Sequence, residues 1–265
     1  MENYDKLLKQ SKFWNAIQNI NSKKEDVKKD TVKLNIGAGP NIFPYDGWIN
    51  YDHEEFSSYF NWVKTTEGLV PGNNWQLDGP GSLNNLKKLQ DYLRSEPAIK
   101  YEKQDLRKQF NHEDNSVDLI YVGQVIEHLN PIHEAPQLIA ECYRMMAVGG
   151  VIRLTTPDLD LLINAYLNGN MDKFKIDQPV FYKTAEPAMQ LSYIMFGATG
   201  PNCTFNHYEG HMCMYNKSSI TTLLKNAGFK NIEFYYELGK SKNNIMQKEA
   251  VDAGISHSFI VEAVK

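Results

Sequence analysis

From residue 32 onward, short apolar runs alternate with stretches that have helical periodicity. Strands that alternate with helices are typical of a parallel sheet with helices on both faces. The segment Gly239–Gly254, between the last two runs, is polar and has no strong amphipathic stripe, which predicts an antiparallel last strand. The expected strands are Val32–Ile36, Trp48–Tyr51, Ile99–Lys103, Val117–Val122, Val151–Thr155, Ile232–Tyr236 and Ser258–Val264, and the expected helices are Ser82–Arg94, His133–Met146 and Ser218–Ala227.

Composition excludes several classes of protein. The 265 residues are 42% hydrophobic and 23% charged, which indicates a globular core rather than disorder. A net charge of −4, with four Arg among the 28 cationic side chains, disfavours a nucleic-acid partner. The three cysteines suit a reducing compartment. No window approaches the roughly 18 apolar residues of a membrane span, and the N-terminus does not resemble a signal peptide. We therefore expect a soluble, cytoplasmic protein.

The chain divides into an extension and a main domain. Residues 1–31 predict an amphipathic N-terminal helix, and residues 32–265 predict the α/β domain. Two segments, at about 53–81 and 159–216, interrupt the alternation and are rich in aromatic side chains. Loops of this length usually bind ligands or cover them. Both follow the carboxyl ends of strands, where open α/β sheets bind ligands, so we expect a lid there.

Three strand ends carry residues suited to a nucleoside ligand. The first strand runs into Gly37-Ala38-Gly39, and glycines let the backbone turn sharply and approach a ligand. Position 42 is Ile, so the third glycine of a dinucleotide fingerprint is missing, which favours a ligand without phosphates. Asp52 ends the second strand and suits ribose hydroxyls, and Asp105 follows the third and suits an adenine amino group.

The fourth and fifth strands complete a recognisable pattern. A strand that reads Asp118-Leu119-Ile120 is followed by Glu127-His128-Leu129, by a helix with Glu141 and Arg144, and by Gly149-Gly150. Here the sequence resembles the class I S-adenosylmethionine-dependent methyltransferases, well over residues 32–158 and loosely over 211–264. The resemblance implies a Rossmann-like seven-stranded sheet. It also implies S-adenosylmethionine as cofactor and S-adenosylhomocysteine as product.

The resemblance also implies roles for single residues. Gly37 and Gly39 would form the floor under the methionine part of the cofactor, and Asp52 would hold the ribose. The segment between the glycine turn and the second strand, residues 40–47, is too short for the family's first helix. The ribose ligand could therefore lie elsewhere, at Glu54 or Glu55. The remaining expected contacts with the cofactor are Asn35 and Ala38 in the glycine turn segment, Asp105 and the backbone of Leu106 at the adenine, and Gln124 beyond the fourth strand.

An alcohol acceptor needs a base, and four residues are candidates for it. His211 resembles a His of sugar-modifying relatives and is our first choice; the others are His207, His128 and Asp158. The ring of His128 could instead cap the following helix.

Metal binding is not assigned to any residue. The spacing of Cys203, His207, His211 and Cys213 fits none of the common zinc arrangements. A divalent ion held by Asp158, Asp160, Glu209 or a His stays an open alternative.

The expected activity is O-methylation of a sugar hydroxyl, in a free sugar, a nucleotide-linked sugar or a glycan. Two features motivate the sugar: the Trp, Tyr, Asn and Asp content of the insertions, and the stretch Thr156–Asp160, which resembles glycan-modifying members of the family. An apolar small molecule, such as a quinone or lipid precursor, is the alternative acceptor. A catalytically silent binding module is the non-enzymatic alternative. The oligomeric state is not predicted.

Overall fold

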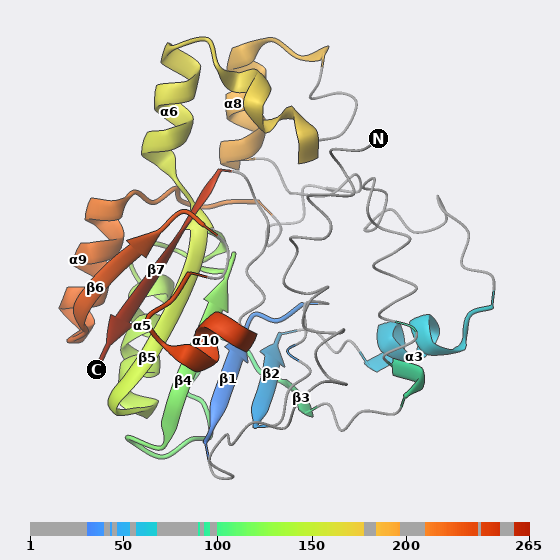
Figure 1. Cartoon of the computed structure of the whole chain (residues 1–265), viewed down its shortest axis with the longest axis vertical. Coiled ribbons are helices and arrows are strands. Elements are labelled where there is room, and N and C mark those ends of the chain that lie inside the picture. Colours follow the sequence, from blue (N-terminus) through green and yellow to red (C-terminus); the bar gives the residue numbers. More distant parts are fainter. Residues whose placement is uncertain are drawn as a thin grey trace.

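The computed structural model describes residues 31–39, 43, 47–53, 57–67, 90, 93–95, 100–177, 184–196, 210–237, 240–249 and 257–265. These residues form a seven-stranded sheet with the order β3-β2-β1-β4-β5-β7-β6 (Figure 1). Strands β1 to β5 pair in parallel, whereas β7 runs antiparallel to β5 and β6, so the predicted antiparallel last strand is confirmed. The strands are β1 (Lys33–Ile36), β2 (Trp48–Asp52), β3 (Lys100–Lys103), β4 (Val117–Gly123), β5 (Met146–Pro157), β6 (Lys230–Tyr235) and β7 (Ser258–Val264).

The central strands are covered on both faces. β1 is buried along its whole length, and β4 is buried over Leu119–Val122. Burial on both faces explains why these strands read as continuous apolar runs in the sequence. The carboxyl ends of β1, β2 and β4 meet at one edge of the sheet, which is the edge where such sheets bind ligands.

Helices α5 (Glu134–Met145) and α9 (Lys217–Ala227) cover one face of the sheet. Leu138 of α5 and Leu224 of α9 are fully buried in the main apolar cluster beneath them. The sequence explains both ends of α9. The Asn216 side chain accepts a hydrogen bond from the third helical amide, and Gly228 ends the helix with a φ of +111°.

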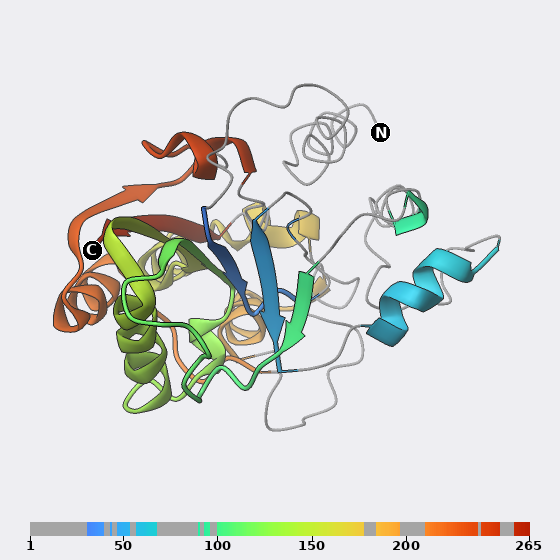
Figure 2. The same cartoon turned by 90° about the horizontal axis from the view of Figure 1, so that it is seen from below.

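The opposite face carries a smaller apolar cluster and a helix that the sequence did not predict. Trp48 and Tyr121 pack there with Met246 of α10 (Asn244–Glu249). Figure 2 shows α10 on one side of the sheet and α5 and α9 on the other. The expectation that Gly239–Gly254 has no strong helical stripe overlooked α10, because a helix of six residues needs one buried apolar side chain rather than a stripe.

Two groups of helices extend beyond the sheet. α6 (Leu159–Leu167), the 3₁₀ helix η3 (Met171–Asp177) and α8 (Pro187–Phe196) lie past the carboxyl ends of the strands (Figure 1). They share an apolar cluster of their own. α3 (Ser57–Thr65) lies outward of β3 (Figure 1). These elements fall in the two segments predicted as insertions, and their action as a lid stays a prediction.

β5 begins earlier than the sequence predicted. It starts at Met146, directly after α5, whereas the prediction placed Gly149 and Gly150 in a turn before the strand. These glycines lie inside β5, where the register with β4 shifts, and Gly149 has a φ of +83°. The glycines therefore form an irregularity within the strand.

Other predictions concern residues that the structure does not describe. The helix predicted within residues 1–31 falls almost entirely on residues 1–30, which the structure does not describe, and most of the predicted helix Ser82–Arg94 also lies outside the described residues. Within the described ranges, no helix has both the length and the apolar character needed to cross a membrane.

Candidate active site

Gly37, Ala38 and Gly39 form a tight turn at the carboxyl end of β1. The amides of Gly37 and Ala38 both donate to the carbonyl oxygen of Tyr51, at 2.8 and 2.9 Å. Gly37 has a φ of +70° and Gly39 a φ of +50°, in the region that favours glycine. A Cβ atom on Gly37 would lie 2.2 Å from Cγ2 of Val125, whereas one on Gly39 would meet no atom of the described residues within 4 Å. A ligand can therefore approach the backbone at Gly39.

Asp52 ends β2 directly beside this turn. It is 7% exposed. Its Oδ2 atom accepts a hydrogen bond from the Gly39 amide at 2.8 Å, and Oδ1 lies 2.9 Å from Nδ1 of His53. A carboxylate can accept about four hydrogen bonds, so these contacts do not exclude ribose hydroxyls. Asn35 is buried, and its Nδ2 atom donates to Oδ1 of Asn50 at 2.9 Å, so its side chain links β1 to β2.

Asp105 and Leu106 follow β3 at the same edge. Nε and Nη2 of Arg107 donate to the Asp105 carboxylate at 2.8 and 3.1 Å. These hydrogen bonds lower the pKa of Asp105 to about 2. An adenine amino group would share the carboxylate with Arg107. Leu106 is 8% exposed and belongs to the main apolar cluster, which leaves its backbone as the part that an adenine can contact.

Gln124 follows β4 with a φ of +56°, which is unusual for a residue with a side chain. Its Nε2 atom donates to Oγ1 of Thr155 at 3.1 Å and to Oγ of Ser258 at 3.3 Å. The side chain therefore links the ends of β4, β5 and β7 beneath the ligand edge.

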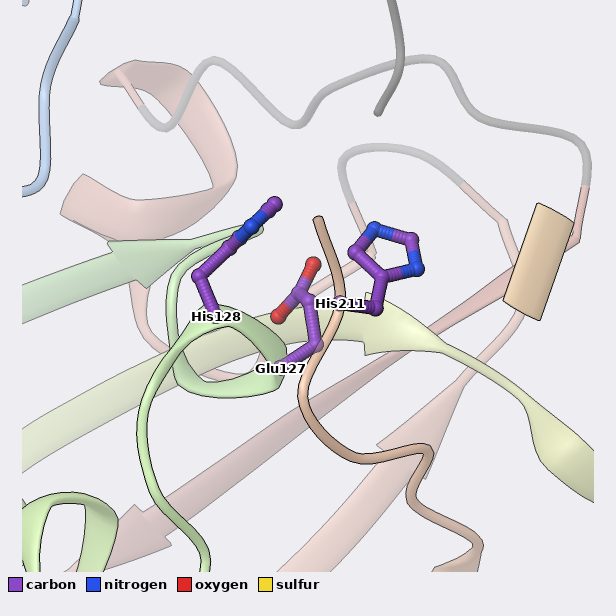
Figure 3. Close-up of side chains that lie close together, drawn as sticks. All are labelled: Glu127, His128 and His211. Atoms are coloured by element: carbon purple, nitrogen blue, oxygen red, sulfur yellow. The ribbon is translucent and has the colours of Figure 1, made fainter. Parts of the chain in front are cut away.

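Glu127, His128 and His211 come together beyond β4. Glu127 and His128 belong to the 3₁₀ helix η2 (Ile126–His128), while His211 comes from a segment more than 80 residues later. One possible metal-ligand atom from each of the three lies within 4.8 Å of the other two. Figure 3 shows the Glu127 carboxylate beside the two imidazole rings, which pack edge to face with their centroids 4.8 Å apart.

Backbone hydrogen bonds hold the two segments of this cluster together. The amides of Met212 and Cys213 donate to the carbonyl oxygen of Glu127, at 2.7 and 3.2 Å. Nδ1 of His128 lies 3.3 Å from the carbonyl oxygen of Gly210. The next helix is not capped by His128. Oδ1 of Asn130 accepts from the first amides ahead of α5, at 2.9 and 3.2 Å.

Burial dominates the electrostatics of the cluster. It raises the pKa of Glu127 to about 8, although a hydrogen bond from Thr156 opposes this. Burial, with the nearby His211, lowers the pKa of His128 to about 4. Burial also lowers the pKa of His211, partly offset by the backbone of Ile194 and Met195 in α8. Both imidazoles are therefore neutral near pH 7, and each has a lone pair that can accept a proton or bind a cation.

Asp158 lies at the N-terminus of α6 and not in this cluster. Its Oδ1 atom accepts from the amides of Asp160 and Leu161, and Oδ2 accepts from the Tyr236 hydroxyl at 3.0 Å. Asp158 is 2% exposed, and its two hydrogen bonds with backbone amides make it the N-terminal cap of α6. Asp160 is bound through Oδ1 to Nδ2 of Asn216 at 3.2 Å. The other candidates, Cys203, His207 and Glu209, lie outside the described residues.

A family model described as a methyltransferase domain matches residues 38–233. The chain belongs to this family. It is an S-adenosylmethionine-dependent methyltransferase, with S-adenosylhomocysteine as the product. The expected class I methyltransferase fold is confirmed. The catalytically silent alternative is not supported.

Solved structures of similar fold share little sequence with the methyltransferase. One is a methyltransferase from Thermotoga maritima, described as a possible histamine N-methyltransferase, with a TM-score of 0.46 and 11% identity over 100% of this chain and 95% of that chain. Another, from Archaeoglobus fulgidus, has a TM-score of 0.44 and 15% identity over 99% of this chain and 98% of that chain. No curated protein shows significant sequence similarity to the chain.

The structure brings two residues to the candidate site of the methyltransferase that sequence reasoning did not select. Glu127 precedes His128 in the Glu-His-Leu turn, but its burial beside the two imidazoles has no sequence signal. His257 is 3% exposed, and burial together with the nearby His211 lowers its pKa to about 4. The sequence position of His257 could have indicated this. It directly precedes β7, and an antiparallel strand begins at the edge of the sheet where the parallel strands end.

Proposed function

We propose that this methyltransferase methylates a hydroxyl group of a sugar, in a free sugar, a nucleotide-linked sugar or a glycan. The observation that carries the proposal is the buried cluster of Glu127, His128 and His211 beside the glycine turn. Val125, which contacts Gly37, lies two residues before Glu127 in the chain. The cofactor turn and the cluster are thus neighbours, as a methyl donor and its acceptor must be.

The residues at the glycine turn fit the cofactor. S-adenosylmethionine supplies a methyl group on a positively charged sulfur. Gly39 leaves room for a ligand, Asp52 is held beside it by the Gly39 amide, and Asp105 stays ionised through Arg107. We assign the methionine part to the turn, the ribose to Asp52, and the adenine to Asp105 with the backbone of Leu106. We place Gln124 at the end of this cofactor site, beyond β4.

His211 is proposed as the group that takes the proton of the acceptor. A sugar hydroxyl is a poor nucleophile while it keeps its proton. His211 is 7% exposed, and its Nδ1 atom has no hydrogen-bond partner among the described residues. His128 lies against it and is proposed to orient it. Asp158 is bound by two amides and a hydroxyl, so we assign it to the start of α6 rather than to proton transfer.

An apolar acceptor is the second candidate, because the surface next to His211 has exposed apolar residues. Met212 is 53% exposed and Phe196 is 64% exposed. Gly210 lies close to the Phe196 carbonyl, since a Cβ atom on Gly210 would be 3.0 Å from it. Such a surface suits a quinone or lipid precursor, whereas the Trp, Tyr, Asn and Asp content of the insertions favours a sugar.

The proposal is tested with methyl-labelled S-adenosylmethionine and two acceptor panels. One panel contains free and nucleotide-linked sugars and oligosaccharides, and the other contains quinone precursors and phenolic lipids. We expect label in a sugar as a base-stable ether. Label in the second panel alone would overturn the sugar acceptor in favour of the apolar one.

A cytoplasmic location is part of the proposal, and Cys142 and Cys213, which are free thiols, suit its reducing conditions.

A further inference from the structure

Two buried polar atoms in the Glu127 cluster have no hydrogen-bond partner within the described ranges. They are Oε1 of Glu127 and Nδ1 of His211. The Glu127 side chain has no exposed surface. Buried polar atoms without a partner are rare, because each one costs about 1–3 kcal/mol of desolvation. The Glu127 carboxylate lies beside both imidazole rings (Figure 3), so its unpartnered oxygen indicates a missing ligand in this cluster rather than a packing accident.

The charge of the cluster identifies the kind of ligand. No Lys or Arg of the described residues forms an ion pair with Glu127, and its other oxygen, Oε2, accepts a neutral hydrogen bond from the Thr156 hydroxyl at 3.1 Å. A carboxyl group buried at this depth is either protonated or paired with a cation, and a cation that binds it displaces the proton. The two imidazoles supply nitrogen donor atoms close to this carboxyl group, so the surroundings favour a cation and disfavour an anion.

The donor atoms identify the class of cation. Two imidazole nitrogens and one carboxylate oxygen suit first-row transition metals such as Zn²⁺, Co²⁺ or Mn²⁺, whereas Ca²⁺ and Mg²⁺ prefer all-oxygen sites. At metal–ligand distances of about 2.0–2.2 Å, the ligand atoms of one ion lie about 3–4.4 Å apart. The three residues offer ligand atoms within 4.8 Å of one another, so small side-chain rotations complete the site.

We propose that Glu127, His128 and His211 bind one divalent transition-metal ion. Three protein ligands leave a coordination position open, as in catalytic zinc sites. The binding of the ion stands on the three residues alone, while its role in catalysis rests on the proposed function. In that role the ion holds the acceptor hydroxyl and lowers its pKa, so the proton leaves to solvent. The oxygen then bonds to the methyl carbon, and the electron pair of the breaking C–S bond stays on sulfur. With the ion bound, His211 serves as its ligand, and the proton-accepting role proposed above applies to the protein without the ion.

Cobalt is the probe for the test, because Co²⁺ in a site of this kind absorbs visible light. The full chain is treated with a chelator, dialysed and titrated with Co²⁺, with Zn²⁺ displacement followed by calorimetry. We expect one equivalent to bind, and we expect Glu127→Gln and His211→Ala to weaken the binding by at least about 10- to 100-fold. His128→Gln is the further variant if Glu127→Gln does not fold.

Two controls match the burial and the chemistry of the ligands. Tyr215→Phe removes a buried hydroxyl that has no partner among the described residues, and His133→Ala removes an exposed imidazole. Both should bind Co²⁺ like the wild type. Absence of Co²⁺ and Zn²⁺ binding by the wild type, or equal binding by His211→Ala and His133→Ala, would overturn the site. Binding without any effect of the chelator on methyl transfer would overturn its catalytic role. Binding without methylation of any sugar would overturn the acceptor and leave the ion site standing.

Discussion

His211 lies beside Glu127 and His128, although it comes from a distant segment of the chain. In the proposed reaction it acts on the acceptor hydroxyl. Replacing it by Ala removes a group that activates the acceptor, either as a base or as a metal ligand. We expect His211→Ala to lower turnover by about 10²- to 10⁴-fold and to leave the affinity for S-adenosylhomocysteine nearly unchanged. Single-turnover kinetics and calorimetry measure the two quantities. His133→Ala, an exposed imidazole at the start of α5, is the control. Full turnover by His211→Ala would remove this residue from the mechanism.

Asp52 is expected to contribute to cofactor binding in two ways. Its carboxylate holds the Gly39 amide and accepts the ribose hydroxyls, so Asp52→Ala leaves all of these donors without their charged acceptor. We expect binding of S-adenosylhomocysteine to weaken by about 1–3 kcal/mol in calorimetry. Asp172→Asn, a change at an exposed residue of η3, should bind like the wild type. An unchanged affinity of Asp52→Ala would move the ribose ligand elsewhere, with Glu54 and Glu55 as the next candidates.

The sequence predicted individual site residues to different extents. The glycine turn and Asp52 could be predicted, because a strand end followed by a Gly or an Asp is a local pattern. Burial of Glu127 could not, since it depends on His211, which the fold brings in from the far side of the insertion. Asp158 was a candidate base because it follows the end of a strand. Its carboxylate instead accepts hydrogen bonds from the first backbone amides of α6, a role that the residue type alone does not distinguish from that of a base.

The turn after β1 is the element whose glycines can be compared most directly. Gly37→Ala adds a Cβ atom that clashes with Val125, and it also places Ala at a positive φ. Gly39→Ala places Ala at a positive φ without a clash. We expect Gly39→Ala to lower the free energy of unfolding by about 1–2 kcal/mol. Gly37→Ala should cost about 1–3 kcal/mol more because of the contact. Urea unfolding measures both. The double variant Gly37→Ala/Val125→Ala should recover the difference, and equal costs for the two single variants would contradict the packing described.

Arg144 links helix α5 to the preceding loop, because it donates hydrogen bonds to Glu141 of the helix and to the Phe110 carbonyl oxygen of the loop. The stability that this link contributes should depend on pH. Burial alone would raise the pKa of Glu141, but hydrogen bonds from Arg144 and the Phe110 amide outweigh it and hold the pKa below its ordinary value. A carboxyl whose folded pKa is lowered stabilises the fold above its unfolded pKa of about 4.3 and loses this effect as the pH falls through the folded value.

The matched test is Glu141→Gln. Its deficit in unfolding free energy relative to the wild type should be largest near pH 7 and should shrink below about pH 4, as measured by urea unfolding across this range. Glu113→Gln, a change at an exposed residue, should show little deficit at any pH. A deficit for Glu141→Gln that is the same at pH 7 and pH 3 would rule out the ionised carboxylate as its cause.

At the element level the sequence predicted strands better than connections. All seven strands were found near their expected positions. Burial on both faces makes the central strands β1 and β4 visible as apolar runs, whereas β3 is mostly exposed and β6 at most half-buried. The early start of β5 and the short helix α10 were missed. Both depend on tertiary contacts: β5 extends through Gly149 and Gly150 by pairing with its neighbours, and α10 is held by Met246 against Trp48 and Tyr121.

For the whole molecule, the helices beyond the ligand edge should respond to ligands. α6, η3 and α8 form a cluster of their own past the carboxyl ends of the strands, and α3 lies outward of β3. We expect amides in residues 53–81 and 159–216 to exchange more slowly when S-adenosylhomocysteine and an acceptor are bound. Hydrogen exchange measured by mass spectrometry reports this, with α9 as the internal reference. Equal exchange in both states would make these segments a fixed scaffold.

The way in which His211 is attached has a consequence for evolution. Met212 and Cys213 hold this segment on the carbonyl oxygen of Glu127 through main-chain amides, which every residue except proline possesses. The side chains at these two positions can therefore change while His211 keeps its place. Met212 is half exposed beside the cluster, so substitutions there would alter which acceptor fits without dismantling the chemistry. Acceptor preference can therefore diverge at position 212 while the backbone that holds His211 stays the same.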